Sequence, residues 1–250
     1  MKLFKLLLIA AALSSSFTSS AQFKLGDALK KAASSVSSPS ATEIGAGLKE
    51  ALEAGVSAGA DRLSAKDGFL GNAAVKLLFP PEAQKIEKTL RGLGMNKLCD
   101  DFVTSMNRAA EEAAREAKPI FISAIKQMSI KDASNILLGG QKDAATQYFK
   151  NVTTSQLKAA FTPVIQSNLE KTGATRYWAD VTAAYNKVPL VKKINTDLTD
   201  YATQKSVDGL FHEVAEEELK IRTSSGARTS PLLQKVFGYA DKSSNGVTIN

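Results

Sequence analysis

A helical repeat of apolar residues in the middle of the chain constrains the fold more than any other feature of the sequence. Apolar side chains recur there every three or four positions, at Met95, Leu98, Phe102, Met106, Ala109, Ala113 and Ala117. This is the spacing of a helix with one buried face. Because the second half of that face consists of alanine, a neighbouring helix can approach it closely.

Start and stop signals divide the rest of the chain into further helices. Residues 129–132 have the Ser-x-x-acid pattern of a capping box, and residues 139–140 are a Gly-Gly stop. Residues 153–156 predict another helix start, and Ser230-Pro231 predicts a third. Residues 120–128 are apolar on nearly every side, so we expect them at the centre of the core. The sequence predicts an all-α protein, a single-domain irregular helical bundle of about 7–10 helices with several short capped helices.

The first 21 residues have the pattern of a secretory signal peptide. A basic start at Lys2 and Lys5 precedes the apolar run Leu6–Leu13, and a small-x-small site ends at Ala21. The apolar run is short for a bilayer span, so cleavage after Ala21 is favoured over retention as an N-terminal membrane anchor. We therefore expect a periplasmic or secreted protein with no transmembrane segment after cleavage.

Composition divides the mature chain into three parts. Residues 22–42 are rich in Ser, Ala and Lys, which predicts a flexible lead-in. Residues 43–238 carry the helical repeats and form the predicted helical domain, which is long enough for one buried core. Residues 239–250 follow the last amphipathic turn and predict a disordered tail.

The helix expected from residue 43 onward contains four glycines, at Gly45, Gly47, Gly55 and Gly59. Each costs about 1 kcal/mol of helix propensity relative to Ala, so we expect a closely packed neighbour. Residues 55–59 also match the G-x-S-x-G pattern of a hydrolase nucleophile elbow. That motif requires a strand before the serine, whereas the preceding LKEALEA predicts a helix. We interpret the match as small residues at a helix contact.

Charge and residue inventory exclude several classes of function. The formal charge of +7 falls to +5 without Lys2 and Lys5, and its spread over the chain, without a basic stripe, argues against nucleic-acid binding. Weak association with anionic envelope surfaces is the expectation from the surplus charge. Cys99 is the only cysteine, so no intramolecular disulfide forms, and we expect it buried on an apolar helix face. His212 is the only histidine, which excludes zinc sites built on several His and Cys ligands.

Charged residues recur in the motifs of the chain and are the candidates for a ligand site or polar cluster. They are Arg108, Glu111, Asp132, Asp143, Asp208, Glu218 and Arg222. Helix caps explain Asp132 and Asp143 more simply, and a solvated ion-paired helix face explains Arg108 and Glu111. Glu213, Glu216, Glu217 and Glu218 are expected on the exposed face of one helix. We expect no metal site and no cofactor, and the sequence assigns no catalytic residue.

An aromatic stripe lies after residue 176, at Tyr177, Trp178, Val181 and Tyr185. At helical spacing such a stripe is more often a core or partner contact than a ligand platform. The sequon at Asn151 would matter only in a glycosylating host.

Several motifs occur in one order along the chain. They are Met106–Glu111 (MNRAAE), the spaced residues Met128, Asp132 and Ala133, Ile136–Gly139, Asp143–Phe149 (DAATQYF), Asp208–Phe211 (DGLF), Glu217–Arg222 and Val236-Phe237. In these motifs, from about Glu43 to Gly238, the chain resembles the bacterial domain of unknown function 4197 family. The resemblance implies an exported, helical bacterial protein, and it transfers no catalytic residue to this chain.

Two functions follow from these features. The favoured one is a non-catalytic exported helical protein that binds a partner or a small apolar ligand in the cell envelope. The alternative is a carboxylate-based metal-dependent or hydrolytic enzyme with a polar site around Arg108, Asp132 and Asp208. They differ in whether those three side chains meet in space.

Overall fold

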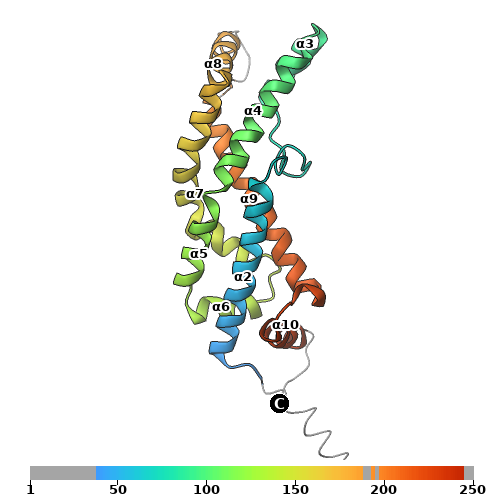
Figure 1. The fold of residues 1–250 in the computed structure, drawn as a ribbon, viewed down its shortest axis with the longest axis vertical. Helices are drawn as coiled ribbons and strands as arrows, with labels where there is room; N and C mark the ends of the chain where they lie inside the picture. Colours follow the sequence, from blue (N-terminus) through green and yellow to red (C-terminus); the bar gives the residue numbers. More distant parts are fainter. Residues whose placement is uncertain (1–37, 188–192, 195–196, 245–250) are drawn as a thin grey trace, which may run out of the picture. The chain divides into compact units, whose positions relative to one another are not determined.

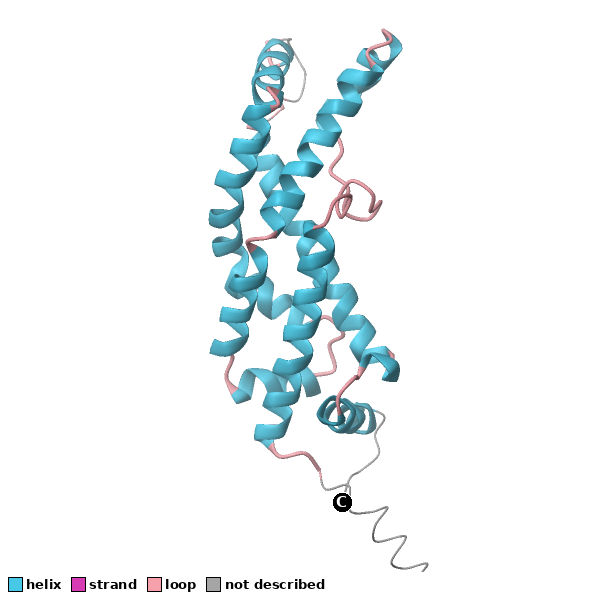
Figure 2. Cartoon of the chain, in the orientation of Figure 1, coloured by secondary structure: helices cyan, strands magenta, loops and turns pink. Residues whose placement is uncertain are grey.

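The computed structural model describes residues 38–187, 193–194 and 197–244. These residues form helices joined by loops, with no strand among them, so the predicted all-α fold is confirmed (Figures 1 and 2). In these ranges the nine α-helices are α2 (Ala41–Ser64), α3 (Gln84–Gly92), α4 (Asn96–Ala114), α5 (Ala117–Gln127), α6 (Ile130–Leu138), α7 (Ala144–Lys171), α8 (Ala174–Tyr185), α9 (Leu198–Thr223) and α10 (Pro231–Ser244), with 3₁₀ helices η1 (Pro81–Ala83) and η2 (Ser225–Ala227). The predicted signal peptide and most of the predicted lead-in lie outside the described residues.

Four long helices build the core of the unit that begins at Pro39. Helix α7 packs against α4 and α9, and α2 packs against α9 and α4. Their shared interior is filled by large side chains that are fully buried, among them Met106, Phe149, Leu157 and Phe161. Helices α5, α6 and α10 pack against α2 from outside this group. Burial of these apolar side chains is the main force that holds the bundle together.

Close packing against the glycines of α2 agrees with the sequence prediction. A Cβ atom at Gly47 would lie 2.9 Å from Val236 of α10, and one at Gly59 would lie 3.5 Å from Cβ of Glu213 on α9. The absent side chains therefore let α10 and α9 approach the backbone of α2. Residues 55–59 lie inside α2, so Ser57 has the backbone of a helix and not that of a nucleophile elbow.

The helix start predicted at residues 153–156 is wrong, because α7 continues through it from Ala144 to Lys171. The Thr153 hydroxyl donates to the carbonyl of Phe149 at 2.6 Å, and the Thr154 hydroxyl donates to the carbonyl of Lys150 at 2.6 Å. A threonine hydroxyl can either cap a helix start or donate to a carbonyl one turn earlier in the same helix, and both threonines do the latter.

The helical structure extends beyond both predicted bounds of the helical domain, residues 43 and 238. Helix α2 begins at Ala41, because Ser40 and Glu43 form a capping box that starts it two residues early. Helix α10 continues to Ser244, six residues into the segment predicted to be disordered. Tyr239 packs half-buried against the core, and the guanidinium of Arg228 lies 2.7 Å from the carboxylate of Asp241. Tertiary contacts therefore fix the start of the predicted tail.

Helix α5 is less central than its composition suggests. Phe121 and Ile125 are buried, but Ile120 and Ile122 on the other sides are only half-buried. The prediction that residues 120–128 form the centre of the core is therefore wrong, and the long helices α4, α7 and α9 take that place.

A substitution at Gly209 tests the close approach of α9 to the segment that follows α2. A Cβ atom there would lie 2.8 Å from the Phe69 ring and 3.2 Å from Cβ of Val75. We expect Gly209→Val to lower the free energy of unfolding by about 1–3 kcal/mol, because the core is already filled. Urea unfolding followed by circular dichroism measures the change. The control is Gly238→Ala in α10, which meets nothing within 4 Å, and a loss of stability there equal to that of Gly209→Val would contradict the packing explanation.

Candidate functional site

A cleft of about 460 Å³ lies between the α3–α4 pair and the α7–α8 pair. This volume is within the range of small-molecule binding sites. Its apolar lining consists of Ile86, Leu90, Leu98, Cys99 and Phe102 from α3 and α4, Ala174, Tyr177 and Trp178 from α8, and Phe79 from the segment before η1. A second cavity beside α2 and α9 has a volume of only about 20 Å³, which suits one water molecule. The larger cleft is therefore the candidate ligand site.

Three aromatic rings form a continuous contact along the cleft. The ring centroids of Phe79 and Phe102 are 4.5 Å apart, and those of Phe102 and Trp178 are 5.7 Å apart in a stacked arrangement. Phe79 comes from a loop, Phe102 from α4 and Trp178 from α8. The rings therefore join the two helix pairs and present an apolar wall to the space between them.

The polar residues of the cleft are mostly engaged with their own helices. The Ser105 hydroxyl donates to the carbonyl of Phe102 at 2.8 Å, and the Thr172 hydroxyl donates to that of Leu169 at 2.9 Å. The side-chain amide of Asn168 donates to the carbonyl of Val164 at 2.8 Å. These bonds reduce the number of donors that face the cleft, which makes its surface more apolar than its composition indicates.

Cys99 lines the same cleft and is fully buried, as the sequence predicts. Burial raises the pKa of its thiol, because a thiolate loses the solvation of water there. The protonated thiol is a weak nucleophile. Cys99 therefore belongs to the apolar wall and lacks the environment of a reactive cysteine.

Of the candidates, Arg108 lines the cleft, and Glu111 forms an ion pair with it. The guanidinium of Arg108 lies 2.5 Å from the Glu111 carboxylate and 2.7 Å from that of Asp67. These two carboxylates raise the pKa of Arg108, with the hydrogen bond to Glu111 the larger cause. Glu111 is buried and also accepts hydrogen bonds from the backbone N–H groups of Phe69 and Leu70 at 3.2 Å. The pair thus holds the segment that follows α2.

Two further side chains fix this segment, residues 65–80, which joins α2 to η1 without helical structure of its own. The side-chain amide of Asn107 donates to the carbonyl of Leu77 at 2.8 Å and accepts from its N–H at 2.9 Å. The Tyr201 hydroxyl donates to the carbonyl of Leu78 at 3.0 Å, and burial raises the pKa of Tyr201 to about 12. Together these bonds position Phe79 at the cleft.

The candidates Glu218 and Arg222 form a second pair, at the start of α7. The Glu218 carboxylate accepts from the N–H groups of Ala145 and Thr146 at 2.9 and 2.8 Å, and from the Thr146 hydroxyl at 2.8 Å. Arg222 lies 2.8 Å from Glu218 and also donates to the carbonyl of Ile136. Glu218 on α9 therefore caps α7, a role normally taken by the residue just before a helix.

The last three candidates have separate local roles. Asp132 completes the predicted capping box with Ser129, and these hydrogen bonds lower the pKa of Asp132. Asp143 is exposed and makes no side-chain cap, so the prediction that it caps a helix is wrong. The Glu218 carboxylate instead accepts from the backbone N–H groups at the start of α7. Asp208 is exposed and accepts from Gln204 at 2.7 Å.

The structure does not join the seven candidates into one cluster. Arg108, Asp132 and Asp208 lie on α4, α6 and α9, and each bonds to a different partner: Glu111, Ser129 and Gln204. Across residues 38–244, leaving out the gaps noted above, no three His, Cys, Asp or Glu side chains are placed to hold one metal ion.

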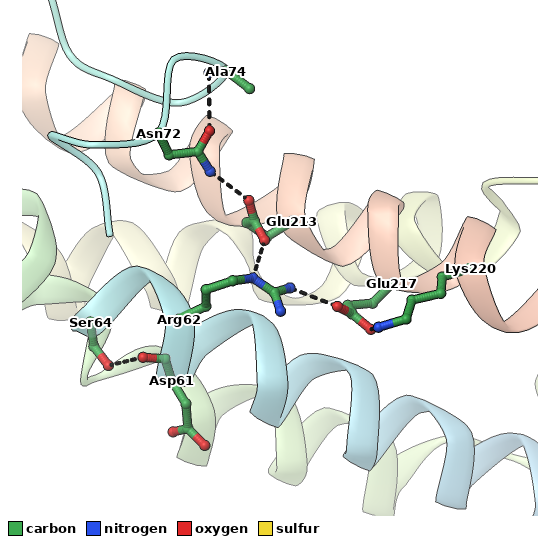
Figure 3. Close-up of polar contacts among 8 residues, drawn as sticks. All are labelled: Asp61, Arg62, Ser64, Asn72, Ala74, Glu213, Glu217 and Lys220. Carbon is green, nitrogen blue, oxygen red and sulfur yellow. Dashed lines mark hydrogen bonds and ion pairs between the residues drawn. The ribbon is translucent and has the colours of Figure 1, made fainter. Parts of the chain in front are cut away.

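A further polar cluster, absent from the sequence-based candidates, links α2 to α9 (Figure 3). The guanidinium of Arg62 lies 2.9 Å from the Glu213 carboxylate and 2.6 Å from that of Glu217. Glu213 also accepts from the side-chain amide of Asn72 at 3.0 Å. The hydrogen bond that Arg62 donates to Glu217 is the largest cause that raises the pKa of Arg62. The expectation of an exposed face for the four glutamates of α9 is wrong, since only Glu216 is exposed.

The described residues define a class: an all-α protein with an apolar cleft between two helix pairs, and with buried carboxylates that hold its connecting segments. Residues 38–238 match the family described as protein of unknown function (DUF4197), and the chain belongs to this family. The resemblance drawn from the motifs is thereby confirmed. No curated protein and no solved structure matches the chain.

Removal of the Glu218 carboxylate tests its role as the cap of α7. In Glu218→Ala the guanidinium of Arg222 and two N–H groups of α7 lose their buried acceptor. We expect a loss of about 3–5 kcal/mol in the free energy of unfolding. Glu216→Ala, on the exposed face of the same helix, should change it by less than about 0.5 kcal/mol. Equal effects of the two substitutions in urea unfolding would contradict this role.

Proposed function

We propose that this protein binds a small apolar ligand in the cleft between α3–α4 and α7–α8, as a non-catalytic protein of the cell envelope. The observation that carries the proposal is the aromatic and aliphatic lining of a cleft of about 460 Å³. Leu98 and Tyr177 line it and are also exposed, so the cleft is open to solvent beside them. Water in such a cleft is released when an apolar molecule enters, which favours binding.

The charges in the cleft favour a neutral ligand. Arg108 is balanced by Asp67 and Glu111, and Asp101 lies 2.6 Å from the ammonium of Lys97. A charged ligand would have to compete with these partners or leave its own charge without one. Burial of a charge without a partner is costly. We therefore expect neutral, mainly aromatic or aliphatic molecules to bind best.

The surroundings of the cleft support binding over catalysis. The hydroxyls of Ser105 and Thr172 donate to main-chain carbonyls, and the Cys99 thiol is held protonated by burial. A nucleophile needs an adjacent base or a lowered pKa. The enzyme hypothesis, which depends on Arg108, Asp132 and Asp208 meeting, has no such support in the geometry described above.

Fluorescence of Trp178, the only tryptophan of the chain, tests ligand binding directly. The probe is N-phenyl-1-naphthylamine, a neutral apolar dye that accepts energy from tryptophan. Titration of the mature protein should quench Trp178 emission and increase dye emission with saturation. Leu98→Glu should weaken binding at least about tenfold, because a carboxylate would enter the apolar cleft.

The control for this titration is Leu138→Glu. Leu138 on α6 is 42% exposed and Leu98 is 41% exposed, but only Leu98 lines the cleft. Leu138→Glu should bind the dye as the unaltered protein does. Equal weakening by both substitutions, or no saturable quenching at all, would overturn the proposed function.

The proposal places the protein in the envelope on the signal-peptide pattern of residues 1–21. When the full chain is expressed in a bacterium with a secretion system, we expect the protein in the periplasmic or secreted fraction to begin at Gln22. Amino-terminal sequencing and intact mass measure this. A chain that begins at Met1 and stays in the membrane fraction would instead show that the apolar run remains as an anchor.

A further inference from the structure

The lining of the cleft changes in character along α4. Leu98 and Phe102 line it near the start of this helix, whereas Thr104, Ser105 and Arg108 line it further on. From position 98 to position 108 the helix axis rises by about 15 Å. The cleft therefore has an apolar end and a polar end, and we call the part lined by Thr104, Ser105 and Arg108 the polar end.

The Thr104 hydroxyl forms no hydrogen bond with the residues that the structure describes. Ser105 and Thr172, which also line the cleft, satisfy theirs by donating to main-chain carbonyls. The Tyr177 hydroxyl lacks a bond within the described ranges as well, but this side chain is 64% exposed, so water reaches it. Thr104 is half-buried. An apolar group lying against it would leave its hydroxyl unpaired, which is costly.

Arg108 adds hydrogen-bond donors to the polar end. It lies one helical turn after Thr104 and lines the same cleft, so the two side chains are neighbours on the surface of α4. A guanidinium has five N–H groups, and the bonds to Glu111 and Asp67 use two of those of Arg108. The side chain is 36% exposed, so its other N–H groups can donate to a ligand. The polar end therefore offers donors from Arg108 and a hydroxyl oxygen that can accept.

Both charged residues of the lining already have partners. Arg108 contacts two carboxylates, those of Asp67 and Glu111. Asp101 pairs with Lys97 at 2.6 Å, and its side chain is 62% exposed. An anionic head group at the polar end would meet more carboxylates than cations, and a cationic head group would compete with Arg108 for its two carboxylates. An uncharged head group avoids both penalties.

We infer that the ligand of the cleft is an uncharged amphiphile, with a hydrocarbon body and a hydroxyl head, such as a long-chain alcohol. This inference rests on the proposed function and names the class of its ligand. The body lies against the apolar end, and the hydroxyl accepts from Arg108 and donates to the oxygen of Thr104. A hydroxyl is the smallest uncharged group that does both. It replaces the hydrogen bonds of the water that it displaces, which a hydrocarbon cannot do.

Displacement of N-phenyl-1-naphthylamine from the mature protein by 1-decanol tests this class of ligand. Thr104→Val keeps the shape of the side chain and removes its hydroxyl. This variant should bind the dye, which has no hydroxyl, as the unaltered protein does, and it should bind decanol about fivefold more weakly because one hydrogen bond is lost. Thr104→Ser retains a hydroxyl and should bind decanol within about twofold of the unaltered protein. Decanoate and decyltrimethylammonium should bind the unaltered protein at least about tenfold more weakly than decanol does.

The matched control is Thr154→Val, at a half-buried threonine of α7 that does not line the cleft and donates to the carbonyl of Lys150. It should bind dye and decanol as the unaltered protein does. Unchanged decanol binding by Thr104→Val, or an equal loss of dye and decanol, would overturn the inference and leave the proposed function standing. Tighter binding of either charged amphiphile than of decanol would have the same meaning. Failure of the unaltered protein to bind both dye and decanol would overturn the proposed function and the inference together.

Discussion

The placement of the segments that connect the helices depends on buried carboxylates that accept hydrogen bonds from backbone N–H groups. Glu111 of α4 accepts from Phe69 and Leu70, and Glu218 of α9 accepts from Ala145 and Thr146. A buried carboxylate is costly unless it is paired and hydrogen-bonded. Both satisfy this condition in the same way, since an arginine one helical turn away, Arg108 or Arg222, neutralises each of them.

These carboxylates also explain the motifs that carry the family resemblance. MNRAAE contains Asn107, Arg108 and Glu111, which hold the segment between α2 and η1. Thr146 of DAATQYF and Glu218 of the last charged motif form one cap. In DGLF, Gly209 leaves room for Phe69. The motifs first suggested a possible polar site, but the structure assigns their members to fixing connections between helices.

Local signals predicted most helices well, and several of the errors arose where residues distant in the sequence decide the outcome. The Ser129–Asp132 box and the apolar face of α4 depend on neighbours in sequence, and both are present. Asp143 has the residue type of a cap, but Glu218, more than seventy positions away, takes the contact. The end of α10 likewise depends on Arg228 and Asp241. The spacing of apolar residues along the sequence does not indicate which distant residues pair in this way.

The cleft was beyond prediction for the same reason. Trp178 and Tyr177 are neighbours on one helix, yet Trp178 is buried in the aromatic wall while Tyr177 is exposed. The sequence places both in one aromatic stripe, and the packing of α8 separates them. Val181 and Tyr185, the other members of that stripe, have side chains outside the described residues.

The hydrogen bonds that fix residues 65–80 constrain the register of α4. Asn107 and Glu111 are four positions apart, about one turn, so they project from one side of the helix toward the two parts of the segment. One inserted residue between them would rotate one side chain about 100° away from the other. The two contacts could then not form together, although the helix itself would be intact. The length of α4 between these residues is thus as constrained as their chemical identity.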